Sequence, residues 1–133
     1  MIPANNGFLS QDFTIEEQVS RTYRMDIDKL HIRGFTDQLE AMTQAVYKII
    51  NTERYSCIIY SRNYGIELVD LYGQPMTYVL PELKRRITEA LIQDSRITSV
   101  DAFNFAVEKQ TILCTFTVHT IYGDIIAERA VNF

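Results

Sequence analysis

The alternating segment at residues 111–119 is the part of this sequence that most restricts the fold. Ile112, Cys114, Phe116 and Val118 are apolar, and the alternate positions carry three threonines and a histidine, at 111, 115, 117 and 119. Successive side chains of a β-strand point to opposite faces, so a period of two predicts a strand with one face in the core. We therefore expect a β-sheet in the last third of the chain.

Further strands are predicted on both sides of this segment. Residues 103–107 also alternate, and residues 108–110 predict the connecting turn. Gly123 and Asp124 predict a second turn, which leads into a final strand at residues 125–133.

The first half of the chain contains two more candidate β segments. Residues 22–33 alternate on both sides of a turn at Asp28 and Lys29, which predicts a hairpin that ends at Gly34. Residues 57–60 (Cys-Ile-Ile-Tyr) predict a short central strand, because both of its faces would be apolar.

Two segments with a period of 3.6 predict long helices. Asp37 followed by Glu40 is typical of a helix start, and this helix is expected to end near residue 50. The second helix is expected at about residues 79–93, with Pro81 in its first turn and the basic residues 84–86 mostly outside its buried stripe. The expected buried positions are Leu39, Met42, Val46, Ile49 and Ile50 in the first helix, and Leu80, Leu83, Ile87 and Leu91 in the second.

The order of these elements predicts the fold class. With a short helical segment at residues 65–71, the pattern is β-β-α-β-α-α-β-β-β. It indicates an α+β fold in which two long helices and one short helix pack on a mostly antiparallel sheet. A chain of 133 residues has the usual length of one domain and buries roughly 68% of its unfolded surface. We expect a flexible, polar arm at residues 1–20 and a single domain at residues 21–133.

Composition argues against several classes of function. The net charge of −4 lacks the basic excess of nucleic-acid-binding proteins. The apolar runs are too short for a membrane span, and residues 1–18 do not resemble a secretion signal, so we expect synthesis in a cytoplasm. Cys57 and Cys114 are predicted to be two buried thiols, with a disulfide as the alternative. No metal or cofactor is expected, since His31 and His119 lie far apart.

Residues that could support catalysis are present but badly placed. The carboxylates available for an acid–base pair are those of Glu53, Asp70, Glu82 and Asp94. Arg54 follows Glu53 directly, and a neighbouring cation favours the ionised form, which is wrong for a general acid. A nucleophile pair of Cys57 and His119 is the other option, although a cysteine beside two isoleucines is more typical of a core. We therefore expect no enzymatic activity.

Several motifs taken together resemble a known family. They are NTERY at residues 51–55, YGIELVDLYGQP at 64–75, ELKRRITEALIQD at 82–94 and DSRITSV at 94–100. This combination resembles the baseplate wedge or sheath-initiator family of contractile phage tails, in the branch found in prophages and tailocins of Gram-positive bacteria. The resemblance extends from Arg33 to about Val118.

The sequence departs from the family pattern at two junctions. Many members have Gly-Glu-Arg at the first junction, where this chain has Thr52, Glu53 and Arg54. Many have Glu-Pro-Arg after the second long helix, where this chain has residues 94–96, Asp-Ser-Arg. The acid and the arginine are kept at both places, but the rigidity that proline gives a turn is lost.

The resemblance implies a structural role in the baseplate of a virion or tailocin particle. Members of the family link the baseplate to the tail sheath and act as the template for the first sheath ring through β-strand addition. The implied partners are the tail sheath protein and other baseplate wedge and hub proteins. Six copies per particle are expected, and neither nucleic acid nor a membrane is an expected partner.

Two sets of residues are candidates for this role. The first is a structural clamp or partner-binding site, in which each arginine fork holds a helix-to-strand junction. Its members are Glu53, Arg54, Tyr64, Gly65, Asp94 and Arg96. The second is a sheath-docking strand formed by Ile125, Ala127, Arg129, Val131 and Phe133. The alternative for the clamp is an ordinary surface ion pair, and the alternative for this strand is an ordinary edge strand.

Two other classes of function stay open at this point. Some relatives have been labelled lysozyme-like, which suggests a peptidoglycan hydrolase of a baseplate. A small regulatory adaptor is the third class, because a stress-response anti-adaptor shares the same general fold.

Overall fold

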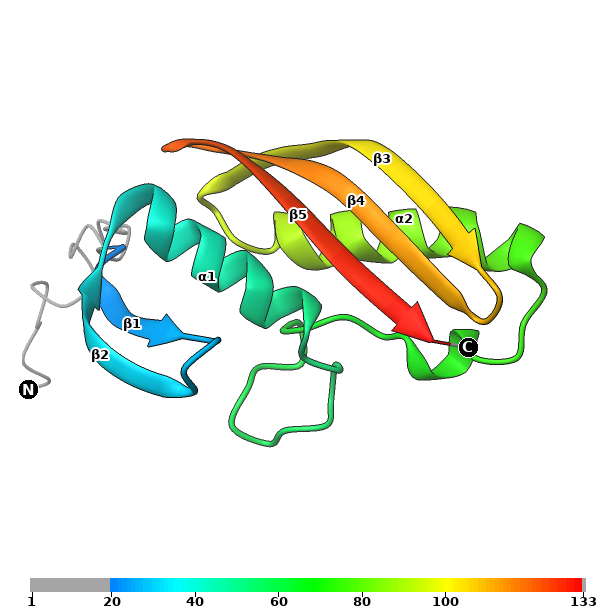
Figure 1. Ribbon diagram of the computed structural model, residues 1–133, viewed down its shortest axis with the longest axis horizontal. Helices are drawn as coiled ribbons and strands as arrows, with labels where there is room; N and C mark the ends of the chain where they lie inside the picture. The colour runs from blue at the N-terminus through cyan, green and yellow to red at the C-terminus, as the bar shows by residue number, and fades with distance from the viewer. Residues whose placement is uncertain (1–19, 133) are drawn as a thin grey trace, which may run out of the picture.

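The computed structural model describes residues 20–132, in which two helices and five antiparallel strands form an α+β fold (Figure 1). The elements are β1 (Thr22–Asp26), β2 (His31–Thr36), α1 (Gln38–Ile50), the 3₁₀ helix η1 (Val69–Leu71), α2 (Met76–Ile92), β3 (Ile97–Glu108), β4 (Thr111–Thr120) and β5 (Gly123–Asn132). The predicted fold class is therefore confirmed. The predicted arm, apart from Ser20, lies outside the described residues.

The strands form two separate antiparallel sheets. β1 and β2 pair with each other, whereas β3, β4 and β5 form a three-stranded sheet with β4 in the centre. The pairing of β4 with β5 is regular from Thr111–Asn132 to Thr120–Gly123. The pairing of β3 with β4 shifts in register between Ile97 and Ser99 and again between Asp101 and Asn104. One edge of the sheet is thus regular and the other is bulged.

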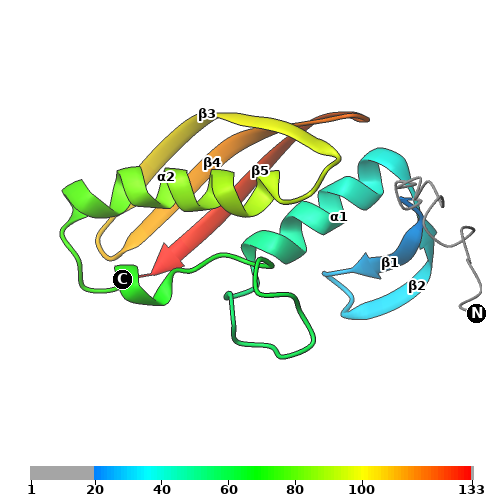
Figure 2. The same ribbon diagram turned by 180° about the vertical axis from the view of Figure 1, so that it is seen from behind.

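Both long helices cover one face of the three-stranded sheet, as the two opposite views show (Figures 1 and 2). α2 packs on β3, and α1 packs on β5 and on α2. The inward face of β4, formed by Ile112, Cys114, Phe116 and Val118, is completely buried against them. The alternation at residues 111–119 therefore predicted the centre of the core correctly.

α1 begins and ends as its sequence predicts, with one error in its buried face. Asp37 is the N-cap and accepts a hydrogen bond from the backbone N–H of Gln38 at 2.7 Å. Glu40 accepts a hydrogen bond from the hydroxyl of Thr36 at 3.1 Å, so it binds the preceding strand. Leu39 is 39% exposed, which corrects its expected place in the core, and Ala41 is buried instead.

α2 begins three residues earlier than predicted, at Met76. Pro81 therefore lies inside the helix and not in its first turn. Proline removes one hydrogen bond within a helix, to the carbonyl of the residue four positions earlier. That residue is Thr77, and both Thr77 and Pro81 lie on the exposed side of α2, where water can satisfy the free carbonyl.

The prediction of a central strand at residues 57–60 is wrong. These residues form turns in an exposed loop between α1 and η1. Cys57 is therefore an exposed free thiol, which corrects its expected burial, whereas Cys114 is a buried free thiol as predicted. A strand needs a neighbour with which to pair its backbone groups, and this segment instead bonds to itself, as in the contact from the N–H of Tyr60 to the carbonyl of Cys57. High β-propensity alone did not decide its structure.

Two turn predictions also need correction. Gly34 does not end the first hairpin but lies within β2. The turn between β4 and β5 consists of Ile121 and Tyr122, and Gly123 is already the first residue of β5. The turn at residues 28–29 and the one that follows Glu108 are where the sequence predicts them.

Candidate functional site

The connection between α1 and α2 folds back on itself directly after α1. The N–H of Ile66 donates to the carbonyl of Thr52 at 2.9 Å, and the N–H of Arg54 donates to the carbonyl of Ile66 at 3.1 Å. Gly65 makes this approach possible, since it has a φ of +88° and a Cβ at this position would lie 2.5 Å from the carbonyl oxygen of Thr52. Residues 52–54 and 65–68 therefore form one fixed junction.

The Glu53 side chain holds the far part of this junction. Its carboxylate accepts hydrogen bonds from the backbone N–H of Leu68, at 3.0 and 3.2 Å to its two oxygens, and from that of Val69 at 3.3 Å. Hydrogen bonds from backbone N–H groups to an ionised carboxylate are stronger than those between neutral groups. Glu53 thus fixes the start of η1 to the end of α1.

Arg54 connects the same junction to α2. Its Nε and Nη2 donate to the carbonyl of Gly65 at 3.3 and 3.1 Å, and its Nη1 lies 3.0 Å from a carboxylate oxygen of Glu89. The Arg54 side chain is only 10% exposed, whereas exposed ion pairs contribute little to stability. The planar guanidinium uses its fork to hold a loop carbonyl and a helix carboxylate together.

Arg86 is a member of this site that sequence reasoning missed. It extends from α2 to donate to the carbonyl of Glu67 at 3.0 Å and to both carboxylate oxygens of Asp70, and it also pairs with Glu82. These contacts lower the pKa of Asp70 and raise that of Arg86. The signal was its helical spacing, because Arg86 follows Val79 and Leu83 on the buried side of α2.

Asp94 and Arg96 form a compact second junction between α2 and β3. Arg96 donates to Asp94 through Nη2 at 2.7 Å and through Nε and its backbone N–H, both at 3.0 Å. Burial acts to raise the pKa of Asp94, but the hydrogen bonds and charge of Arg96 outweigh it and lower that pKa. The two residues thus close the turn that lacks the proline of the family pattern.

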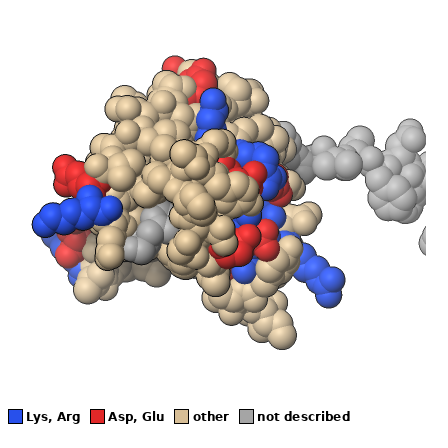
Figure 3. Space-filling model, turned by 90° about the vertical axis from the view of Figure 1, so that its right-hand side faces the viewer, with Lys and Arg blue, Asp and Glu red and all other residues tan. Residues whose placement is uncertain are grey.

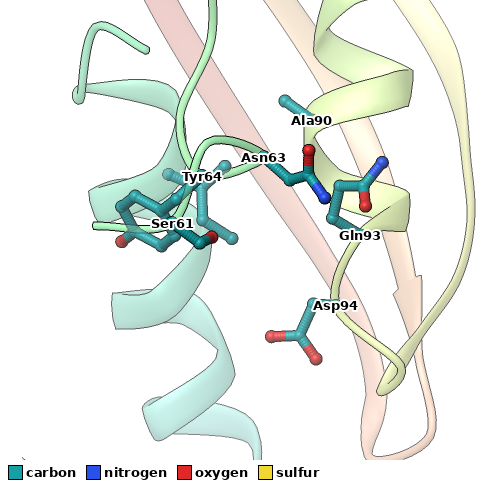
Figure 4. A pocket seen from close by; sticks show the side chains of 7 residues that line it. Ser61, Asn63, Tyr64, Ala90, Gln93 and Asp94 are labelled. Atoms are coloured by element: carbon teal, nitrogen blue, oxygen red, sulfur yellow. The ribbon is translucent and has the colours of Figure 1, made fainter. Parts of the chain in front are cut away.

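The structure brings the two junctions close to each other at Tyr64 (Figure 4). Tyr64 and Asp94 line a hollow of about 320 Å³ together with Ser61, Asn63 and Gln93. Burial, followed by the nearby Tyr60 and Asp94, raises the pKa of the Tyr64 hydroxyl. Arg96 joins Tyr64 and Asp94 in the lining of a second hollow beside α1. All six residues of the predicted clamp thus lie at or between the ends of the two long helices.

β5 lies at the regular edge of the three-stranded sheet, and its predicted docking residues face inward. Ile125 and Val131 are buried in the core, and Ala127 and Arg129 are half-buried beside them. Arg129 donates to the side-chain oxygen of Asn51 at 2.6 Å, which ties β5 to the C-cap of α1. Phe133 lies outside the described residues. Docking through β5 would therefore use its free backbone edge and its outer side chains.

Several of the candidate acid–base groups are held in ion pairs. The pKa of Glu82 is lowered, first by its hydrogen bond from Arg85, and those of Asp70 and Asp94 are lowered too, while a general acid needs a raised value. Both ring nitrogens of His119 are occupied by carboxylates, by Asp124 at 2.7 Å and by Asp101 at 2.9 Å, and these raise its pKa.

The surface and the helices add three observations. On the face drawn in Figure 3, basic and acidic side chains lie beside each other in several small groups. Within residues 20–132, no three His, Cys, Asp or Glu side chains gather so that they could hold a metal ion. Neither long helix of this part of the chain combines the length and the apolar character that crossing a membrane requires.

Comparison with known proteins identifies the family. The family model for the contractile injection system sheath initiator matches residues 20–123, which include both junctions and both long helices. The phage-like element PBSX protein XkdS of Bacillus subtilis (strain 168) is 34% identical over 129 residues, which cover 92% of each chain. The chain therefore belongs to the contractile injection system sheath initiators, a family of structural proteins of phage-like particles.

Proposed function

We propose that this protein links the baseplate wedge to the tail sheath and that β5 is the template for the first sheath ring. A strand from a sheath subunit would add to the free edge of β5 and extend the sheet by β-strand addition. Six copies around the tail axis would then present six such edges. Family membership supports the sheath-initiating role, and the geometry of β5 supports this mechanism.

The difference between the two edges of the three-stranded sheet is the observation that carries this proposal. β5 pairs with β4 over ten residues without a register shift, and β4 is its one partner strand among the described residues. β3, at the other edge, is interrupted twice, and Ala102 within it has a φ of +53°. Bulges protect a sheet edge from pairing, whereas a long regular edge invites it.

The outer side chains of β5 would give the added strand its specificity. Ile126, Glu128 and Ala130 are exposed on the face away from the helices. An incoming strand would place its side chains beside these three residues. The backbone groups of the incoming strand would form hydrogen bonds with the free edge of β5.

We further propose that the two junctions keep β5 in a fixed position relative to the wedge. Arg129 connects β5 to Asn51, the residue just before the junction of Glu53 and Arg54. Asp94 and Arg96 close the neighbouring turn. A rigid connection of this kind would let a wedge protein that binds the junctions hold the docking strand in the orientation that a sheath ring needs.

Electron microscopy of particles from a producing strain tests the role and the mechanism separately. Deletion of the gene should give baseplates and tubes without sheath. The variant Ile126→Lys/Ala130→Lys keeps the core of β5 but places charge along its edge, which should block strand addition. Removal of residues 125–133 would be a poorer test than the sequence suggests, since it deletes the buried Ile125 and Val131.

The matched control is Ala106→Lys, which adds a charge at an exposed position on the outer face of the bulged edge. The control should leave sheath length unchanged, and the double variant should be incorporated into baseplates that carry no sheath. Normal sheath on particles with the double variant would refute the role of the β5 edge. Normal sheath in the deletion strain would refute the function itself.

A further inference from the structure

We infer that residues 55–63, here called the apolar loop, form a knob that inserts into an apolar cleft of a neighbouring baseplate protein with a carboxylate at its border. This inference rests on the proposed function and deepens it by naming the surface that meets the wedge. Figure 1 shows the loop projecting from the body of the molecule below α1.

The tip of the loop is apolar and largely exposed. Ile58 is 100% exposed and Ile59 is 83% exposed, and Tyr55 beside them is 65% exposed. Two adjacent isoleucines at this exposure contribute little to the stability of the free chain, because they remove little apolar surface from water. Exposed apolar groups that occur together mark interaction sites more often than single ones do.

The loop is fixed at both ends, so it projects as a shaped body. The bonds between Thr52, Arg54 and Ile66 close its base, and the hydroxyl of Ser56 donates to the carbonyl of Glu53 at 2.7 Å. At the other end, the rings of Tyr60 and Tyr64 stack with their centroids 4.4 Å apart. A knob that is already ordered loses less conformational entropy when it docks.

The charge of the loop defines the chemistry of its partner. Arg62 is the one charged residue at positions 55–63, within a chain whose net charge is −4. It is exposed, and it forms no hydrogen bond or ion pair with residues 20–132. An arginine that stands free beside an apolar tip is suited to a cleft whose apolar floor takes Ile58 and Ile59 and whose border supplies a carboxylate.

This charge also argues against a second copy of the chain as the occupant. Two loops that packed tip to tip around a two-fold axis would bring two Arg62 side chains together without an acid on either loop. Like charges placed together at an interface oppose association. A different protein that places an acidic side chain opposite Arg62 is the better match.

Photo-crosslinking in the assembled particle tests this inference. The full chain carries benzoylphenylalanine at position 58 in a producing strain, and a second sample carries it at position 121, in the turn between β4 and β5. After irradiation of purified particles, mass spectrometry identifies the adducts. We expect position 58 to yield one adduct with a different baseplate protein, at a peptide of apolar residues flanked by Asp or Glu.

Substitutions measure how much the loop contributes. Ile58→Ser/Ile59→Ser and Arg62→Glu should each reduce the amount of this chain per particle at least tenfold, while Arg62→Lys should retain most of it. Ile121→Ser is the matched control, because Ile121 is also an exposed isoleucine in a turn and should tolerate the change. The melting temperatures of all purified variants should match that of the wild type, which separates loss of docking from loss of fold.

Each outcome decides between the proposals. An adduct of position 58 with a second copy, an adduct with the sheath protein, or unchanged incorporation of the double isoleucine variant would overturn the inference. In all these cases the sheath-initiating function would stand, because it depends on the presence or absence of sheath in the deletion strain.

Discussion

Residues 55–63 and residues 64–71 belong to the same connection between α1 and α2, yet they differ in their relation to the rest of the molecule. The first stretch contains Ile58 and Ile59 and is exposed. The second contains Ile66, Leu68 and Leu71, which are buried in the same core as the apolar residues of both long helices. Both stretches are irregular and rich in apolar residues, so apolar content alone does not explain the difference.

The difference lies in the charged side chains that bind the backbone of the second stretch. Glu53 accepts from two of its N–H groups, while Arg54 and Arg86 donate to its carbonyl groups. Buried backbone groups outside regular structure need such partners, because leaving them unpaired costs free energy. The first stretch has no comparable set of charged partners among the described residues and stays in solvent, where water satisfies its backbone.

The largest loss of stability is expected from Gly65→Ala, in the stretch of residues 64–71. The new Cβ would lie 2.5 Å from the carbonyl oxygen of Thr52, and the φ of +88° is unfavourable for alanine. We expect a loss of about 3 kcal/mol in the free energy of unfolding, measured by urea denaturation.

The control for this prediction is Gly73→Ala. Gly73 has a similar φ of +80°, but a Cβ there meets nothing within 4 Å. This variant should lose only about 1 kcal/mol, from backbone strain alone. Equal losses in the two variants would show that the close approach at Thr52 does not matter.

The second largest effect is expected from Arg54→Ala. It leaves the carbonyl of Gly65 without its charged donor and Glu89 without this partner. Because the side chain is largely buried, we expect a loss of about 2 kcal/mol in the free energy of unfolding and fewer assembled baseplates. Arg62→Ala, in the exposed loop, should change the stability of the purified chain by less than about 0.5 kcal/mol. An unchanged melting temperature and normal baseplates for Arg54→Ala would refute the hypothesis that Arg54 acts as a clamp.

A smaller, pH-dependent effect is expected from Asp94→Asn. The pKa of Asp94 is lower in the folded chain than its ordinary value of 3.8, so its contribution to stability is present above that value. It is lost as the pH falls through the folded pKa. The wild type should therefore lose more stability than Asp94→Asn between pH 5 and pH 2, measured by thermal melts across this range.

Asp28→Asn, in the exposed turn of the first hairpin, is the control for that pH series. It should follow the wild-type profile. A profile of Asp94→Asn that parallels the wild type throughout would mean that the turn of residues 94–96 does not depend on the ion pair.

The smallest effect on stability is expected from Ile58→Ser. Its side chain is completely exposed, so the change should alter the free energy of unfolding by less than about 0.5 kcal/mol in urea. Leu68→Ser, on the clamped stretch, should lose several times more, because it places a hydroxyl in the core. A large loss for Ile58→Ser would show that the apolar loop packs on the body of the molecule.

The same distinction explains which structural predictions from the sequence are correct. The inward face of β4 and most of the buried stripes of α1 and α2 follow from the side-chain period along one element. The contacts of Arg86 and the exposed turns of residues 57–60 do not follow from this period, because they depend on whether distant parts of the chain supply a partner. From the sequence alone, a basic residue on a helix is expected to be solvated, because the loop that it binds is not known.

The candidate site shows the same limit. The pairing of an acid with an arginine at residues 53–54 and 94–96 is visible in the sequence, and so is the family pattern that contains it. The partners of these residues are not visible in the sequence. Glu53 binds Leu68 and Val69, whereas Arg54 binds Gly65 and Glu89. Two adjacent residues thus hold different parts of the molecule.

The sequence by itself determined the α+β class, the two long helices, the regions of the five strands and the family, because these depend on local periodicity and on short motifs. Only the tertiary structure decided which edge of the sheet is regular, which part of the connection is clamped and which part stands in solvent. The physical reason is that burial and hydrogen bonding of an irregular segment depend on groups that the fold brings to it from elsewhere in the chain.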